Sequence, residues 1–150
     1  LSAVTPTGMV GGNNYKSVRH YSADGTVLGM LVLDENSNLV WTYSFNFVTK
    51  QLTKHLDAVT LNYTGTGSDI DVDENGNVYY TGYASNGTNT NGVSIYKKDA
   101  NGGVSLVGSD NILKYGEVVK LKVFNGKIYF AVTGRKTGTS SYQVSIVKQN

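Results

Sequence analysis

Cysteine is absent from this 150-residue chain, proline occurs once and methionine twice. The lack of cysteine excludes disulfides, thiolate nucleophiles and thiolate metal sites. No run of residues approaches the ~18 apolar residues of a membrane helix, so we expect no membrane insertion. Helix-forming residues are scarce, and no long stretch repeats apolar residues at helical spacing. The sequence therefore gives no support to a helical fold.

Charge is also low. The 13 basic and 11 acidic residues give a net charge of +2 and are dispersed along the chain. A nucleic-acid or membrane-surface protein needs a stronger and more concentrated basic patch. We therefore expect no nucleic-acid partner.

The residues that are abundant favour β-structure. The chain has 18 glycines and 11 tyrosines, together with many Asn, Thr, Ser and Val. β-Branched and aromatic residues suit a half-buried sheet surface, and Gly and Asn suit tight turns. The length suits one domain or a piece of a larger one. Because the first residue is Leu, we expect a mature product or a fragment.

The clearest hairpin is predicted over residues 69–84, DIDVDENGNVYYTGYA, where an alternating run enters a Gly/Asn turn and leaves as a Tyr-rich run. The nearly apolar VLGMLVL at 27–33 predicts a buried strand. Residues 46–66 are less regular, and we expect strand, loop and strand there.

Short segments recur along the chain. VSIYKK at 93–98 returns as VSIVKQ at 144–149, fifty-one residues later, and NGNVYY returns as NGKIYF after fifty. DENSNLVWTY also resembles DENGNVYYTGY, thirty-nine residues later. The matches at fifty and fifty-one residues predict units of about 50 residues, at approximately 1–66, 67–116 and 117–150. In the first unit, LVLDENSNLVW fits either the inner or the outer hairpin.

Strand parity supports the repeat. The segment DIDV, which begins at Asp69, aligns with KLKV, which begins at Lys120, and each has one apolar and one charged face. If equivalent strands lie side by side, Asp69 and Asp71 lie near Lys120 and Lys122. We expect a solvated or Lys-paired face, where such pairs contribute about 0–1 kcal/mol.

Units of this length, built from short antiparallel strands with Asn/Gly turns, are typical of β-propeller blades. SDIDVDENGNVYYTGYAS, followed by VSIYKKDANGGVSLVG, resembles the bacterial β-propeller repeat of the SBBP type. The resemblance covers about residues 67–150, although the third unit lacks its fourth strand. It implies a bacterial protein that is secreted or on the cell surface, with no catalytic residues.

The predicted fold is therefore all-β: a propeller-like array of antiparallel blades, with about three units in this chain. The chain is a single β-repeat domain or a fragment of a larger propeller. Three units do not close a propeller, which needs four to eight blades. A homodimer, or the remainder of a longer chain, would complete the ring. A small β-sandwich is the alternative.

A weak calcium pattern occurs at Asp71, Asp73 and Asn75, where oxygen ligands alternate before a glycine. The loop lacks the bidentate Glu at its twelfth position, which is Gly82. Asp and Asn are also ordinary turn formers. The pattern favours a turn, with calcium as the alternative; no other cofactor is predicted.

Catalytic signals are weaker still. His20 and His55 have no carboxylate or serine at a suggestive spacing, so we expect surface or packing roles. Trp41 and several tyrosines could form a sugar-stacking platform, although aromatic strands also pack between blades.

We expect a secreted or cell-surface, non-catalytic binding or adhesion module that recognises a glycan or a protein. Loops on a rigid scaffold commonly carry recognition, and the polar loops at 85–92 and 133–141 are the candidates. The candidate ligand-binding residues are Trp41, Tyr83, Asn86, Asn89 and Arg135. Two alternatives remain: a structural blade segment or assembly subunit without a ligand, and a glycan-active enzyme whose site is dispersed in sequence.

Overall fold

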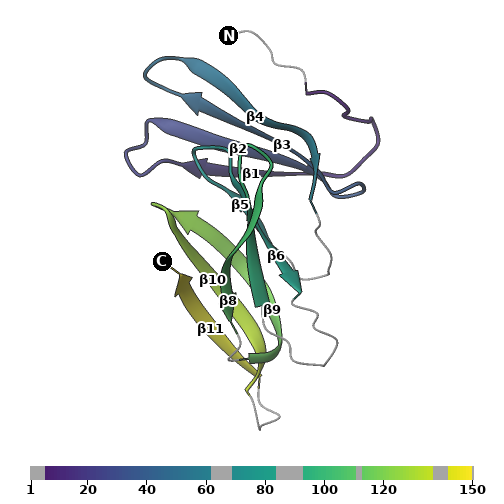
Figure 1. The fold of residues 1–150 in the computed structure, drawn as a ribbon, viewed down its shortest axis with the longest axis vertical. Helices are drawn as coiled ribbons and strands as arrows, with labels where there is room; N and C mark the ends of the chain where they lie inside the picture. Colours follow the sequence, from purple (N-terminus) through teal and green to yellow (C-terminus); the bar gives the residue numbers. More distant parts are fainter. Residues whose placement is uncertain (1–5, 62–68, 84–92, 111–112, 137–141, 150) are drawn as a thin grey trace.

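A computed structural model describes residues 6–61, 69–83, 93–110, 113–136 and 142–149 (Figure 1). Every regular element within these ranges is a β-strand, so the all-β prediction is confirmed. The strands are β1 (Tyr15–Tyr21), β2 (Val27–Asp34), β3 (Leu39–Asn46), β4 (Gln51–Thr60), β5 (Ile70–Val72), β6 (Val78–Tyr83), β7 (Val93–Lys98), β8 (Val104–Asp110), β9 (Leu113–Phe124), β10 (Lys127–Lys136) and β11 (Tyr142–Gln149). None of the described residues forms a helix of the length and apolarity that a membrane span requires.

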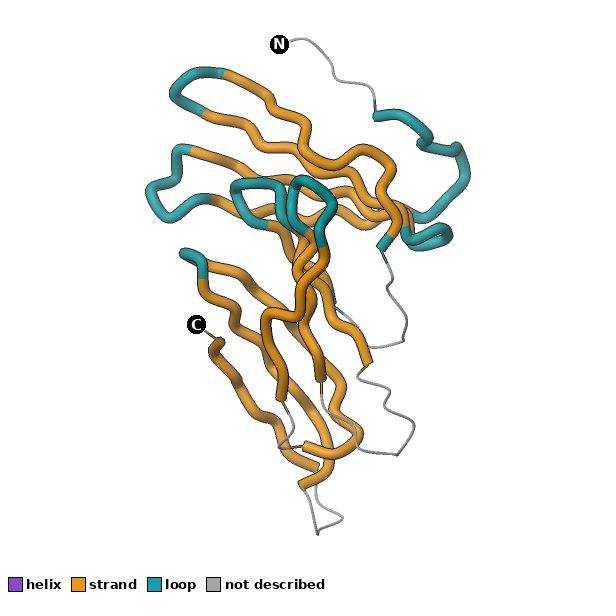
Figure 2. The backbone as a smooth tube through the Cα atoms, viewed as in Figure 1, coloured by secondary structure: helices purple, strands orange, loops and turns teal. Residues whose placement is uncertain are grey.

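The strands form three antiparallel sheets in chain order (Figure 2). Sheet A contains β1 to β4, sheet B contains β5 to β8, and sheet C contains β9 to β11. In each sheet every strand pairs with the strand that precedes it in the sequence. The described strands do not close into a ring, and sheets packed in this way also match the small-sandwich alternative.

The first hairpins of sheets A and B share one turn geometry. Gly25 donates to the Ser22 carbonyl at 2.9 Å, and Gly76 donates to the Asp73 carbonyl at 3.1 Å. Both glycines have positive φ, 71° and 77°, which glycine adopts without strain. The turn equivalent to DENGN therefore begins at Ser22. The segment DENSN joins β2 to β3, so the hairpin around it is the second of sheet A, and its similarity to DENGN does not make the two turns equivalent.

Two boundaries differ from prediction. Residues 51–60 form the single strand β4 rather than a strand and a loop. The pairing of β4 with β3 shifts in register around Thr42, which accommodates the irregular spacing of apolar residues in β4. A β-bulge of this kind bends a strand without ending it. Strand β9 starts at Leu113, ahead of the unit boundary expected at residue 117.

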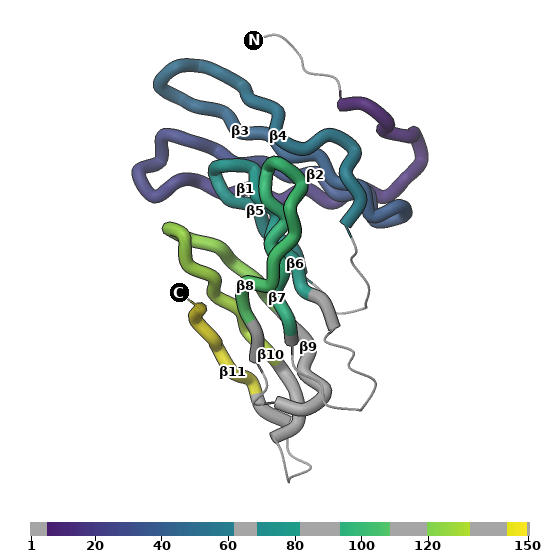
Figure 3. The backbone as a smooth tube through the Cα atoms, in the orientation of Figure 1, coloured from purple at the N-terminus to yellow at the C-terminus, as the bar shows by residue number. Residues whose placement is uncertain are grey.

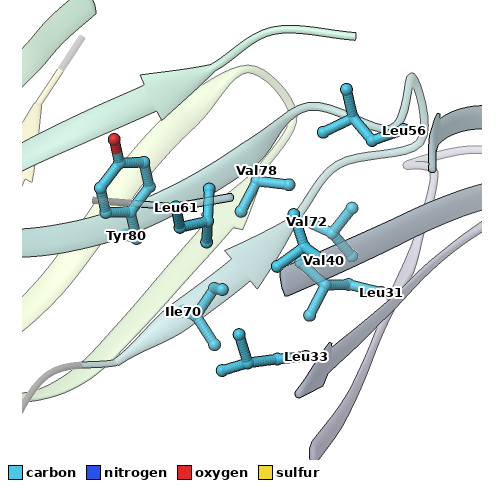
Figure 4. Packing of buried hydrophobic residues seen from close by; sticks show 9 residues of the cluster. All are labelled: Leu31, Leu33, Val40, Leu56, Leu61, Ile70, Val72, Val78 and Tyr80. Atoms are coloured by element: carbon cyan, nitrogen blue, oxygen red, sulfur yellow. The ribbon is translucent and has the colours of Figure 1, made fainter. Parts of the chain in front are cut away.

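Strands β5 and β6 of sheet B are buried on both sides. One apolar cluster lies between sheets A and B (Figure 4) and consists of Leu31, Leu33, Val40, Leu56, Leu61, Ile70, Val72, Val78 and Tyr80. The other lies between sheets B and C and consists of Tyr79, Ile95, Leu121, Val123, Ile128, Phe130 and Val132. Alternation along β5 and β6 sends successive side chains to opposite clusters, as strand geometry requires.

The first strand of each sheet lies beside the first strand of the next, so that β5 contacts both β1 and β9 (Figure 3). Hydrogen bonds between β5 and β9 follow the same order in both segments, since Asp69 bonds to Leu121 and Asp71, two residues later, bonds to Val123. Strands β5 and β9 therefore run in the same direction without forming a shared backbone ladder.

Candidate functional site

Two buried carboxylates join sheet B to sheet C. The amide of Leu121 donates to Asp69 at 2.8 Å, and the amide of Val123 donates to Asp71 at 2.8 Å. Asp69 is 6% exposed and Asp71 only 1%. The carboxylates take the place that a paired strand would occupy at the edge of β9, so they satisfy amides that would otherwise be buried without acceptors.

Lysines on β9 pair with the same carboxylates. Lys120 Nζ lies 3.2 Å from Asp69, and Lys122 Nζ lies 3.0 Å from Asp71. Lys16 of β1 also reaches Asp69, at 3.3 Å. The predicted Asp–Lys juxtaposition is confirmed. The expectation of a solvated aspartate face is wrong, because the apolar cores on either side bury both carboxylates.

Asp69 remains ionised at neutral pH. Burial acts to raise the pKa of its carboxyl, but the amides of Leu121 and Ile70 and the Lys120 ammonium outweigh burial, so the pKa is lowered. A carboxylate that accepts several hydrogen bonds is stabilised in its charged form. Its role here is to fasten one sheet to the next.

The three calcium candidates do not converge. Asp73 accepts hydrogen bonds from the amides of Asn75 and Asn77, at 2.9 and 3.0 Å, and from Asn77 Nδ2 at 2.7 Å. It also accepts from Tyr79 Oη at 3.1 Å, whereas Asp71 is bonded to sheet C. In the part of the chain that the structure describes, no group of three or more His, Cys, Asp or Glu residues could hold a metal ion. The local geometry is that of a turn closed by its own aspartate.

The two histidines, which are distant in sequence, lie against one turn, residues 73–77. His20 Nε2 is 3.2 Å from Glu74 Oε2, an ion pair when the imidazole is protonated. A Cβ on Gly76 would lie 2.4 Å from the His55 ring, so only glycine fits there. Sequence reasoning missed this cluster, because it depends on how sheet B packs on sheet A.

His55 also shares a hydrogen bond of 2.8 Å with Ser44. This is within the range of a nucleophile and its general base. Ser44 is only 9% exposed, however, and no carboxylate among the described residues bonds to His55. Burial lowers the pKa of His55, while nearby Asp73 acts in the opposite direction. The pair is a packing contact at the joint between sheets A and B.

Trp41 is fully buried. Its Nε1 donates to the Thr7 carbonyl at 2.8 Å, and the Tyr15 ring meets it edge-on with centroids 6.3 Å apart. Asp57 holds the same N-terminal segment by accepting from the Thr7 amide and hydroxyl. The indole therefore has no free face for a sugar in this conformation.

Tyr83 and Arg135 lie near the ends of equivalent strands, since β6 ends at Tyr83 and β10 ends at Lys136. Because β5 and β9 run in the same direction side by side, the strands that follow them end at the same end of the molecule (Figure 1). Asn86 and Asn89 lie outside the described residues. Residues 133–136, expected in the loop, belong to β10.

Comparison with known proteins finds little. No protein-family model matches the chain, and no curated protein matches it. Among solved structures, the chain is similar to a putative conserved lipoprotein from Clostridium novyi NT, with 14% identity and a TM-score of 0.44. The match covers 88% of this chain and 85% of the other.

Proposed function

We propose that this protein is a secreted or cell-surface binding module, without catalytic activity, that recognises a glycan or a protein ligand. The ligand contacts the end of the molecule where β6 and β10 end. The observation that supports this proposal is the shared position of these two strand ends, because both continue into polar connections rich in Asn, Thr, Ser and Gly. Such loops on a rigid scaffold provide adaptable hydrogen bonds for recognition.

The scaffold that we propose is propeller-like. Support comes from three successive antiparallel meanders whose first strands lie side by side, with β5 and β9 running in the same direction. In the propeller architecture, sheets of this kind are arranged around a common axis.

Two of the buried carboxylates, those of Asp34 and Asp69, are unsuited to act as a general acid. A general acid in glycoside hydrolysis needs a raised pKa. Here the hydrogen bond from Ser37 leads the effects that lower the pKa of Asp34, and the pKa of Asp69 is lowered as well. Both carboxylates are engaged in structural hydrogen bonds.

A glycan array probed with the full chain tests the proposal, alongside two variants. In the first, residues 85–92 and 137–141 are replaced by Gly-Ser sequences of the same lengths. In the control, the turn at 100–102, at the opposite end of sheet B, is replaced in the same way. We expect wild type and control to bind the same glycans and the first variant to lose binding, with all three folded by circular dichroism.

If the array is empty and affinity capture with the same three proteins finds no ligand that depends on the two loops, the binding proposal fails. The alternative of a structural subunit without its own ligand would then stand. A glycan that is cleaved during the assay would instead favour the enzyme alternative.

A further inference from the structure

Within the described parts of the chain, one face of sheet C carries side chains that remain exposed. The side chains on this face, which we call the C face, are Lys120, Lys122, Phe124, Lys127, Tyr129, Ala131, Val144, Ile146 and Lys148. Phe124, Val144 and Ile146 are 51%, 68% and 81% exposed. A patch of large apolar side chains ringed by charge is typical of an interaction surface.

The C face repeats a face that is covered elsewhere in the molecule. Ile95 of β7 and Ile146 of β11 occupy the same position in the repeat, yet Ile95 is fully buried by sheet C. Lys97 lies over the Tyr79 ring, 5.8 Å from its centroid, and sheet C pairs Lys148 with the equivalent Tyr129. The C face therefore has the pattern of a surface that accepts another sheet.

The opposite end of the molecule carries the complementary pattern. On the outer face of sheet A, which we call the A face, Tyr21 pairs with Leu28. Their equivalents in sheet B, Val72 and Val78, are fully buried against sheet A. Tyr21 is 55% exposed and stacks on Phe47, which is 37% exposed. The N-terminal segment covers Trp41 on the same face, so the exposed part of the A face is its end at Tyr21 and Phe47. That end has the pattern of a surface that packs onto a preceding sheet.

Charge favours pairing of the A face with the C face. Among the described residues, Lys127 and Lys148 have no carboxylate partner. Asp24, in the turn between β1 and β2, has no cationic partner there either, and the Ser22 hydroxyl leads the hydrogen bonds that lower its pKa to about 2. The equivalent turn of sheet B lies on sheet A, where Glu74 meets His20. If sheet A of a second molecule packs on sheet C as sheet B packs on sheet A, Asp24 of that molecule faces the lysine-rich end of β9.

We propose that the C face of one molecule binds the A face of a second copy, and that two such contacts close a head-to-tail homodimer of six sheets. Six sheets lie within the range of closed propellers. The contact joins different surfaces of identical chains, so it either closes or propagates, and closure leaves no apolar end exposed. This inference concerns assembly and does not depend on what the loops bind.

Sedimentation velocity on the full chain, at concentrations up to about 100 μM, tests the assembly. We expect a dimer. Ile146→Glu on the C face and Tyr21→Glu on the A face should each weaken dimerisation by on the order of 100-fold or more, because each places a charge in an apolar contact. Leu106→Glu is the matched control, since Leu106 is 59% exposed on β8 of the middle sheet, away from both faces; it should remain dimeric.

Mixing the two monomeric variants tests the head-to-tail geometry. The A face of Ile146→Glu and the C face of Tyr21→Glu are both intact, so the mixture should recover a weaker heterodimer that neither variant forms alone. If Tyr21→Glu stays dimeric while Ile146→Glu does not, two C faces pair with each other and the proposal is wrong. A monomeric wild type, an open series of larger species, or a monomer whose C face binds anionic vesicles would also overturn it.

Discussion

Asp71 has two partners on the neighbouring sheet, and both depend on its charge. Val123 donates its amide to one oxygen, and Lys122 lies 3.0 Å from the other. Because the carboxylate is 1% exposed, water cannot replace it. Loss of the carboxylate leaves a buried amide without an acceptor, which costs about 1–3 kcal/mol.

We therefore expect Asp71→Ala to lower the free energy of unfolding by about 2–3 kcal/mol, measured by urea denaturation. Asp99→Ala is the control, because the Asp99 carboxylate accepts hydrogen bonds only within its own turn, from Asn101 and Gly103. It should cost about 1 kcal/mol or less. Equal losses in the two variants would contradict a special role for the inner strand.

His55 predicts a pH dependence. Burial lowers its pKa in the folded state below the ordinary value of 6.5. As pH falls through about 6.5, the unfolded chain therefore binds more protons than the folded chain, and the stability present above that pH is lost. We expect urea midpoints to fall between about pH 7.5 and 5.5, and to fall less in His55→Gln.

His20→Gln provides the comparison for this prediction. His20 contacts the same turn through Glu74, at 3.2 Å, so its removal perturbs the same region without removing His55. His20→Gln should leave the decline intact. If the urea midpoint depends less on pH in His20→Gln than in His55→Gln, the pH dependence does not arise from His55 and the prediction is wrong.

At the scale of elements, the turn at 73–77 lies close against β2. A Cβ on Gly29 would be 2.3 Å from the Asp73 carbonyl oxygen, a distance that real Cβ atoms do not adopt. Gly29→Ala should therefore force the turn away from sheet A and cost about 1–3 kcal/mol in thermal or urea unfolding. Gly11→Ala, where a Cβ meets nothing within 4 Å, should be close to neutral.

Sequence periodicity predicts the hairpins well, because alternation and Gly/Asn turns are local properties. It places the inner strands correctly too, since DIDV and KLKV keep the same parity and meet as expected. It fails at β4, where the bulge opposite Thr42 interrupts the alternation of apolar residues, so that one strand is predicted as a strand and a loop. At DENSN it leaves two hairpin assignments open, because one turn composition suits both the first and the second hairpin of a sheet.

In the whole molecule, as far as its residues are described, two apolar cores share sheet B. Each core depends on the middle sheet, so wild-type unfolding should be a single transition by both circular dichroism and the fluorescence of Trp41, the sole tryptophan. Phe130→Ala removes a side chain that is 1% exposed from the core between sheets B and C. A substitution of this kind costs about 3–5 kcal/mol.

In Phe130→Ala, sheet C should therefore unfold first, and part of the circular dichroism signal should be lost at a lower urea concentration than the Trp41 signal. Leu33→Ala, in the core between sheets A and B, should instead move the Trp41 transition to lower urea. Coincident transitions in both variants would indicate that all three sheets unfold as one unit, with no independent step.

The candidate site is less predictable than the fold for a physical reason. Asp71, Asp73 and Asn75 have suitable calcium spacing, but their hydrogen-bond partners are fixed by sheet C and by the turn itself. Trp41 has the chemistry of a sugar platform, but the N-terminal segment covers it. Packing between distant segments decides these outcomes, and residue types alone do not encode it.

The carboxylate joint also has an evolutionary consequence. Asp69 and Asp71 are bonded to main-chain amides, which every residue except proline possesses. The receiving strand can therefore change its side chains without losing these two bonds, provided that its register is kept. A duplicated unit that carries Asp-x-Asp can attach to a diverged neighbour without correlated substitutions, so repeats joined in this way can lose sequence similarity faster than they lose their arrangement.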